Sequence, residues 1–209
     1  MSRQSLPVPP AEALCGRQRL GRQRPRQLQR RALAANAAIA LLLPVIAIAQ
    51  TSAPKVSFEG YLHGAEVRVG DTARFAFEAR LPSGYHVNSN APLDEFLKPT
   101  RLDLALPDGV SVVETVYPAP LMFHTRFSET PLAVYEHQFV IGVQVRLPDD
   151  LPLGEHAVSA TLRYQACSER VCYSPKTRKT GLVLRVVGRD APVTPANEER
   201  FVGIKFSTP

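Results

Sequence analysis

Two cysteines, Cys167 and Cys172, stand with four residues between them in the segment 164–175. A thiol pair at this spacing suits either a permanent disulfide that closes a small loop, or a dithiol that cycles by thiol–disulfide exchange. Closing a loop of about six residues stabilises a fold by roughly 2 kcal/mol, against about 4–5 kcal/mol for a loop near 100 residues. Nearby basic residues favour the thiolate that exchange requires: Arg163, Arg170, Lys176, Arg178 and Lys179. The residues alone leave both chemistries open.

The first 49 residues have the composition of a secretory signal. Eight arginines and one acidic residue, Glu12, precede an apolar run over residues 32–49 that ends in Ala-Ile-Ala before Gln50. A basic region, an apolar region and a small-x-small site predict a secretory signal that is cleaved after residue 49. The apolar run is also close to the ~20 residues that cross a bilayer, so an uncleaved membrane anchor is the alternative.

Removing this signal changes the charge balance. The chain has 25 Lys+Arg and 19 Asp+Glu, and the signal holds eight and one of these, which leaves 17 and 18 and a net charge of −1. Basicity therefore gives no support for a nucleic-acid partner. Cys15 leaves with the signal, so two cysteines remain in an oxidising compartment. About 160 residues are enough for one domain with a core that needs no disulfide.

Short runs of alternating apolar and polar residues follow residue 50, and this period of two is typical of half-buried strands. The clearest runs are residues 74–81, 101–106, 138–147, 158–164 and 182–186. Turn sequences with Gly or Pro separate them, for example around Gly70 and Gly84. We predict an all-β, immunoglobulin-like antiparallel β-sandwich over residues 50–187, followed by a flexible C-terminal tail over 188–209.

Strand parity predicts the orientation of the first cysteine. Tyr164 shares the inward face of its strand with Val158, Ala160 and Leu162. Cys167, three residues further on, is therefore expected to face outward unless a β-bulge intervenes.

The cysteine segment resembles the active-site hairpin in the N-terminal periplasmic domain of the thiol:disulfide interchange protein DsbD. The matching residues are Tyr-Gln-Ala-Cys at 164–167 and Cys-Tyr-Ser-Pro at 172–175, with supporting stretches at 82–88 and 98–102. The similarity covers residues 55–187. Two details depart from the best-known members: the spacing is four residues rather than five, and Ser174 stands where a proline is usual.

The resemblance implies an immunoglobulin-like domain in which Cys167 and Cys172 are the cycling, catalytic pair. Cys172 would be the more exposed sulfur and would form the mixed disulfide with each partner. Electrons would come from a thioredoxin-like domain of a membrane-embedded reductase and pass to a periplasmic disulfide isomerase or another thiol protein. The chain would then be a protein-disulfide reductase component without a cofactor. Its location would be the periplasm, or the inner membrane facing the periplasm if the signal is not cleaved. Because the sequence shows no multi-span membrane domain, we expect the reductase to be a separate protein.

The family also shields its cysteines with an aromatic cap loop, which matches residues 121–129 here. The resemblance implies that Phe123 and Phe127 cover the sulfurs, and the alternative is that each packs into the core.

Two other functions stay open. One is a non-catalytic secreted module that binds a partner or serves as a scaffold, with the disulfide as a permanent staple. The other is a copper- or zinc-binding envelope protein that uses the thiols with histidines. The histidines lack a tight ligand spacing, so no metal site is predicted: His63, His86, His124, His137 and His156. Motifs of hydrolases and nucleotide-binding enzymes are missing from the sequence.

Overall fold

The computed structural model describes residues 52–125 and 130–207. The predicted signal over 1–49 and the candidate cap residue Phe127 lie outside these residues. The described part of the chain contains twelve strands and one short 3-10 helix, η1 (Glu198–Phe201), joined by turns and loops. Within that part, no helix is long and apolar enough to cross a membrane.

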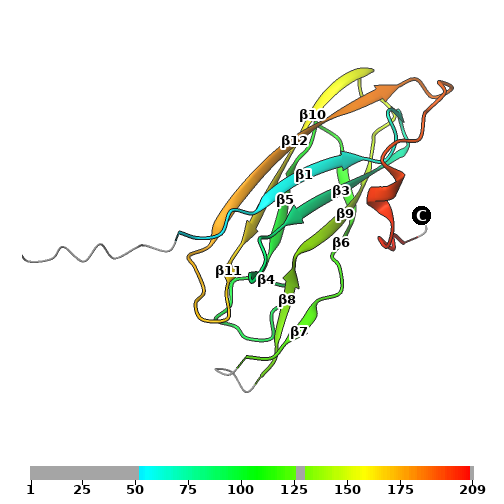
Figure 1. Cartoon of the computed structure of the whole chain (residues 1–209). Coiled ribbons are helices and arrows are strands. Elements are labelled where there is room, and N and C mark those ends of the chain that lie inside the picture. Colours follow the sequence, from blue (N-terminus) through cyan, green and yellow to red (C-terminus); the bar gives the residue numbers. More distant parts are fainter. Residues whose placement is uncertain (1–51, 126–129, 208–209) are drawn as a thin grey trace, which may run out of the picture. The chain divides into compact units, whose positions relative to one another are not determined.

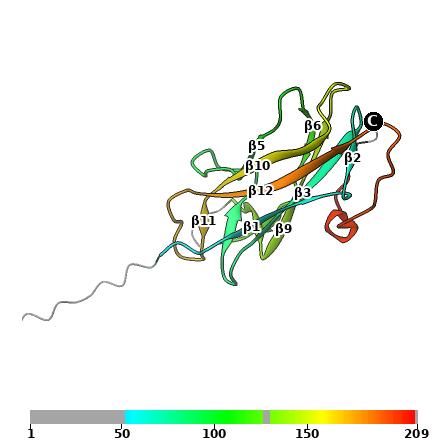
Figure 2. The same ribbon diagram turned by 90° about the horizontal axis from the view of Figure 1, so that it is seen from above.

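The strands form three four-stranded sheets, named sheets A, B and C here (Figures 1 and 2). Sheet A has the order β1 (Ser57–Leu62), β3 (Thr72–Arg80), β9 (Gln138–Arg146), β6 (Ser111–Val116). Sheet B has the order β2 (Val67–Arg68), β12 (Lys176–Val187), β10 (Gly154–Tyr164), β5 (Arg101–Ala105). Sheet C has the order β11 (Ala166–Cys167), β4 (His86–Asn88), β8 (Leu132–Glu136), β7 (Leu121–Phe123).

Sheets A and B enclose the core of an immunoglobulin-like β-sandwich, as the alternation predicts. The inward residues of β3, β9 and β10 are buried, including Phe75, Phe77, Ile141, Val143 and Leu162. Burying one such side chain contributes about 1.5–3 kcal/mol. A single core residue therefore matches the roughly 2 kcal/mol that a disulfide across a six-residue loop can add. The many buried core residues together therefore contribute far more to stability than the Cys167–Cys172 disulfide.

The C-terminal segment differs from the predicted flexible tail, because residues 194–207 contact the sandwich. The Ala65 amide donates to the Thr194 carbonyl at 2.9 Å, and the Asn197 side-chain amide donates to the Leu62 carbonyl at 3.0 Å. The ring of Phe201 packs edge-on against His63 with 4.7 Å between centroids. The proline and polar residues of the C-terminal segment indicate a flexible tail, but its apolar residues hold it against the sandwich.

This segment also buries polar residues that the alternation places on the outer face of sheet A. Glu78 and Gln144 are 3% and 2% exposed, and Arg200 forms an ion pair with Glu78 at 2.8 Å. A Cβ atom on Gly142 would lie 2.9 Å from the Phe206 ring, so the segment needs glycine at this position. The C-terminal segment thus covers part of the outer face of sheet A.

Sheet C extends the sandwich at one end (Figure 1). Strand β8 runs into β9 through His137 alone, whose φ of 53° bends the chain between the sheets. Strand β10 likewise leads into β11 through Gln165. Before β4, the predicted turn contains Gly84 with φ 81°, a value that glycine adopts without strain. These short connections hold sheet C, which carries the cysteines, to the core.

Candidate functional site

A disulfide joins Cys167 at the end of β11 to Cys172 on the returning chain. The Ser168 amide donates to the Val171 carbonyl at 2.8 Å, and the Tyr173 amide donates to the Ala166 carbonyl at 2.9 Å. These bonds flank the cysteines, so the two residues form a non-hydrogen-bonded antiparallel pair, the type in which side chains lie closest. The hairpin backbone therefore brings the two predicted cysteines together.

The two sulfurs have different surroundings. Cys172 is exposed, as the resemblance implies, while Cys167 is only 1% exposed. The outward orientation predicted for Cys167 is wrong, because β10 ends at Tyr164 and Cys167 belongs to a strand of sheet C. The alternation of inward and outward side chains along β10 does not continue into β11, which belongs to another sheet. One cysteine is thus available to a large partner and the other is not.

The loop between the cysteines is held by its own hydrogen bonds. The hydroxyl of Ser168 accepts from the amides of Arg170 and Val171, at 3.3 and 3.2 Å. These bonds satisfy backbone donors of the turn without help from the rest of the domain.

Gln165 connects the hairpin to its surroundings, a role that sequence reasoning missed. Its Nε2 donates to the Tyr173 carbonyl at 3.2 Å. Its Oε1 accepts from Asn88 Nδ2 and from the Lys98 amide, both at 3.2 Å. One side chain therefore links the segment after Cys172 to β4 and to the loop before β5. The only signal in the sequence was its position within the Tyr-Gln-Ala-Cys segment.

His86 on β4 is the second residue whose place beside the cysteines sequence reasoning missed. In the strand register it lies opposite Cys167 on one side and opposite Glu136 on the other. It is 3% exposed, and its Nε2 is buried without a hydrogen-bond partner. Burial lowers the pKa of His86, and the charge of Glu136 acts in the opposite direction.

The candidate cap is described in part. Phe123 is half-buried on β7, and its ring centroid lies 4.8 Å from that of His86. Phe123 therefore lies over the residue beside Cys167. Phe127 is outside the described residues, and shielding of the sulfurs by either phenylalanine stays a prediction.

Two of the basic residues near the cysteines in sequence are engaged elsewhere. Arg163 forms an ion pair with Asp103 at 2.8 Å, and Arg178 donates to the Val56 carbonyl at 2.9 Å. The local sequence therefore overstates how much positive charge is available to stabilise a thiolate.

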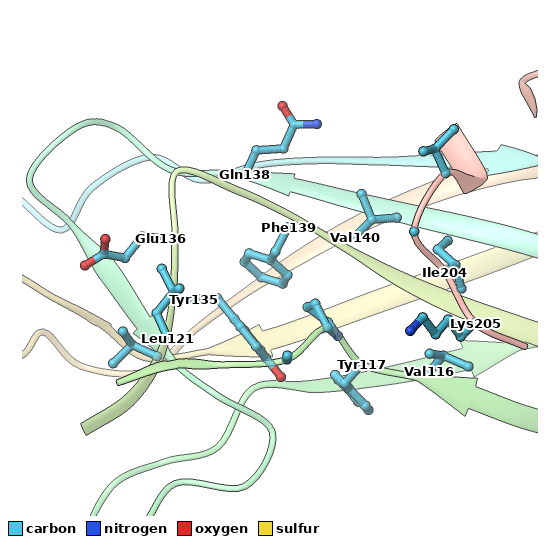
Figure 3. Close-up of a pocket in the computed structure, with 15 residues that line it drawn as sticks. Val116, Tyr117, Leu121, Tyr135, Glu136, Gln138, Phe139, Val140, Ile204 and Lys205 are labelled. Carbon is cyan, nitrogen blue, oxygen red and sulfur yellow. The ribbon is translucent and has the colours of Figure 1, made fainter. Parts of the chain in front are cut away.

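The described residues also form a pocket that the disulfide does not line. It has a volume of about 630 Å³ and is lined by residues of β6, β8 and β9 and by the C-terminal segment, among them Tyr117, Phe139 and Ile204 (Figure 3). Neither cysteine lines it. Across residues 52–125 and 130–207, no group of three or more His, Cys, Asp or Glu side chains is arranged to hold a metal ion. The arrangement at Cys172 therefore suits chemistry at an exposed sulfur rather than in an enclosed cavity.

Comparison with known proteins identifies the family. The model of the family "Thiol:disulfide interchange protein DsbD, N-terminal" matches residues 61–184, more than half of the chain. No curated protein matches the chain.

Several solved structures are similar. The N-terminal domain of DsbD from Neisseria meningitidis, in its reduced form, is 17% identical, with 62% of this chain and 85% of that chain covered and a TM-score of 0.37. The N-terminal periplasmic domain of ScsB from Proteus mirabilis is 14% identical, with 73% of this chain and 54% of that chain covered and a TM-score of 0.43. A complex of the DsbD and PilB N-terminal domains from Neisseria meningitidis contains a chain that is 17% identical. The match covers 59% of this chain and 80% of that chain, with a TM-score of 0.37.

Three observations indicate the same family: the cysteine hairpin, the immunoglobulin-like sandwich that carries it, and the match over residues 61–184. The chain belongs to the family of DsbD N-terminal domains.

Proposed function

We propose that this chain is a periplasmic thiol–disulfide exchange module in which Cys172 attacks partners and Cys167 releases them. The observation that carries the proposal is the asymmetry of the pair: Cys172 is exposed, whereas Cys167 is 1% exposed and bonded to it. A large partner can reach only the first sulfur, and the second is held where it can attack the first.

The exchange proceeds in two steps. The Cys172 thiolate of the reduced chain attacks one sulfur of the partner's disulfide, and the other partner sulfur leaves as a thiolate. Cys167 then loses its proton and attacks Cys172, which forms the intramolecular disulfide and releases the second partner sulfur. Two electrons pass to the partner, whose disulfide becomes a dithiol. The reverse sequence, with a reduced donor, restores the dithiol of this chain.

Membership of the family supports the choice of partners. The proposed donor is the thioredoxin-like domain of a membrane-embedded reductase, and the proposed acceptor is a periplasmic disulfide isomerase or another thiol protein. The predicted signal over residues 1–49 supports a periplasmic location. Phe123 and Phe127 are the proposed shield that keeps small thiols from the sulfurs between encounters.

Trapping of mixed disulfides tests the proposal. Cys167→Ser leaves Cys172 able to attack but removes the releasing thiol, so a mixed disulfide with a thioredoxin-like partner should accumulate on non-reducing gels. Cys172→Ser should trap little, because Cys167 is buried. Either change should lower stability by only about 2 kcal/mol. Equal trapping by both variants would contradict the assigned order, and no trapping with extensive unfolding would favour a structural staple.

A further inference from the structure

Four side chains lie in one row across sheet C and its hairpin. Cys172 is opposite Cys167, Cys167 is opposite His86, and His86 is opposite Glu136. Directly opposed residues of antiparallel strands project from the same face, with Cβ atoms about 4.5–5.5 Å apart. The His86 ring is therefore the neighbour of the buried sulfur, on the side away from Cys172.

The ring has an unused polar atom in the disulfide form. His86 Nε2 is buried without a hydrogen-bond partner, and an unpaired buried polar atom destabilises the fold. Reduction of the disulfide turns Cys167 into a thiol, whose S–H is a donor that the oxidised chain lacks. The atom left without a partner in one redox state can thus gain one in the other.

Cys167 needs such a neighbour. A thiol must lose its proton before it attacks a disulfide, and burial in apolar surroundings disfavours the thiolate. Cys167 is 1% exposed, so water has little access to take the proton. The groups that face His86 from adjoining strands are Cys167 on β11, the carboxylate of Glu136 on β8 and the uncharged ring of Phe123 on β7. Burial lowers the pKa of His86 and so favours the neutral imidazole, the form that accepts a proton.

We propose that His86 is the proton acceptor for Cys167 in the release step, an inference that rests on the proposed function. In the mixed disulfide, His86 Nε2 takes the proton from the Cys167 thiol. The Cys167 sulfur then bonds to the Cys172 sulfur, while the bond from Cys172 to the partner breaks and the partner sulfur leaves with the electron pair as a thiolate. The imidazolium afterwards gives its proton to solvent or to the departing thiolate. When a donor reduces the disulfide, His86 returns a proton to Cys167.

A two-phase reaction with dithiobis-nitrobenzoate, an aromatic disulfide with a coloured leaving thiolate, separates the steps. A Cys15→Ser background leaves Cys167 and Cys172 as the only thiols. Attack by Cys172 releases the first coloured thiolate at a rate that depends on reagent concentration. Attack by Cys167 releases the second at a rate that does not. His86→Gln, which keeps a polar side chain but accepts no proton near neutrality, should slow the second phase on the order of a hundredfold, and leave the first unchanged.

His156→Gln is the matched control, since His156 contacts the Pro152 carbonyl near the start of β10, the end remote from the hairpin. It should change neither phase. The pH profile excludes a merely structural role: between about pH 5 and about pH 9 the wild-type second phase should rise with the ionisation of an imidazole, and in His86→Gln it should rise only with that of a thiol.

A measurement on the unmodified side chains does not depend on how the variant folds. The pKa that governs the second phase should match that of the His86 ring followed by NMR in the reduced chain. A second phase that is equally fast in His86→Gln, or a pKa that does not match, would overturn the role of His86 and leave the proposed function intact. A wild-type chain that releases no second thiolate would overturn the proposed function itself.

Discussion

The side chain of Gln165 donates to the backbone carbonyl of Tyr173 at 3.2 Å, and so joins the residue before β11 to the residue after Cys172. The same side chain accepts from Asn88 and Lys98. The geometry of the cysteine pair is therefore fixed from both sides of the hairpin, and the disulfide is not its only constraint.

This relationship predicts the effect of Gln165→Leu. The change removes three hydrogen bonds and leaves the Asn88 amide with fewer partners, so the free energy of unfolding should fall by about 1–3 kcal/mol. Urea denaturation of the oxidised protein measures it. Gln138→Leu, at an exposed position, is the matched control and should have little effect. Equal losses in the two variants would show that the bonds of Gln165 do not hold the hairpin.

Phe123→Ala tests the proposed cap. Removal of the ring that lies over His86 should admit small reagents, so dithiothreitol should reduce the disulfide several times faster than in the wild type. Met122→Ala is the control, because the exposed Met122 is adjacent in β7 and projects from the other face. Identical reduction rates in Phe123→Ala and wild type would argue against a shielding role for this residue.

Stability should depend on pH through His86. Burial lowers its pKa in the folded chain below the unfolded value of about 6.5, so the unfolded chain binds more protons between these two values. The contribution of the neutral His86 ring to stability is therefore fully present above about pH 6.5. The free energy of unfolding falls as the pH drops toward the folded pKa, by at most about 1.4 kcal/mol per pH unit. Urea denaturation at a series of pH values measures the free energy of unfolding. On acidification this free energy should fall more steeply in the wild type than in His86→Phe. Parallel pH dependences would contradict a buried, neutral imidazole.

Export predicts a defined N-terminus. The mature protein should be recovered from the periplasm and begin at or near Gln50, as mass spectrometry of the purified protein can determine. Recovery of a membrane-bound protein that retains residues 32–49 would instead support the anchor.

The sequence predicted the sandwich because its core strands alternate cleanly, as in β3 and β9, where each inward residue is buried. It predicted the wrong orientation for Cys167 because a single residue, Gln165, carries the chain from sheet B to sheet C. Glu78 and Gln144 were expected outside and are buried, since only the folded chain shows that the C-terminal segment covers them. The place of His86 beside Cys167 was missed for a similar reason, because this pairing joins residues 81 positions apart in the chain.

The reduction potential of the Cys167–Cys172 disulfide tests the exchange function most directly. It can be measured by equilibrating the Cys15→Ser protein with glutathione or dithiothreitol buffers and counting free thiols. An exchange site should have a potential between about −270 and about −120 mV, the range of working oxidoreductases. A value well below about −300 mV would mark a permanent structural disulfide and contradict the proposed function.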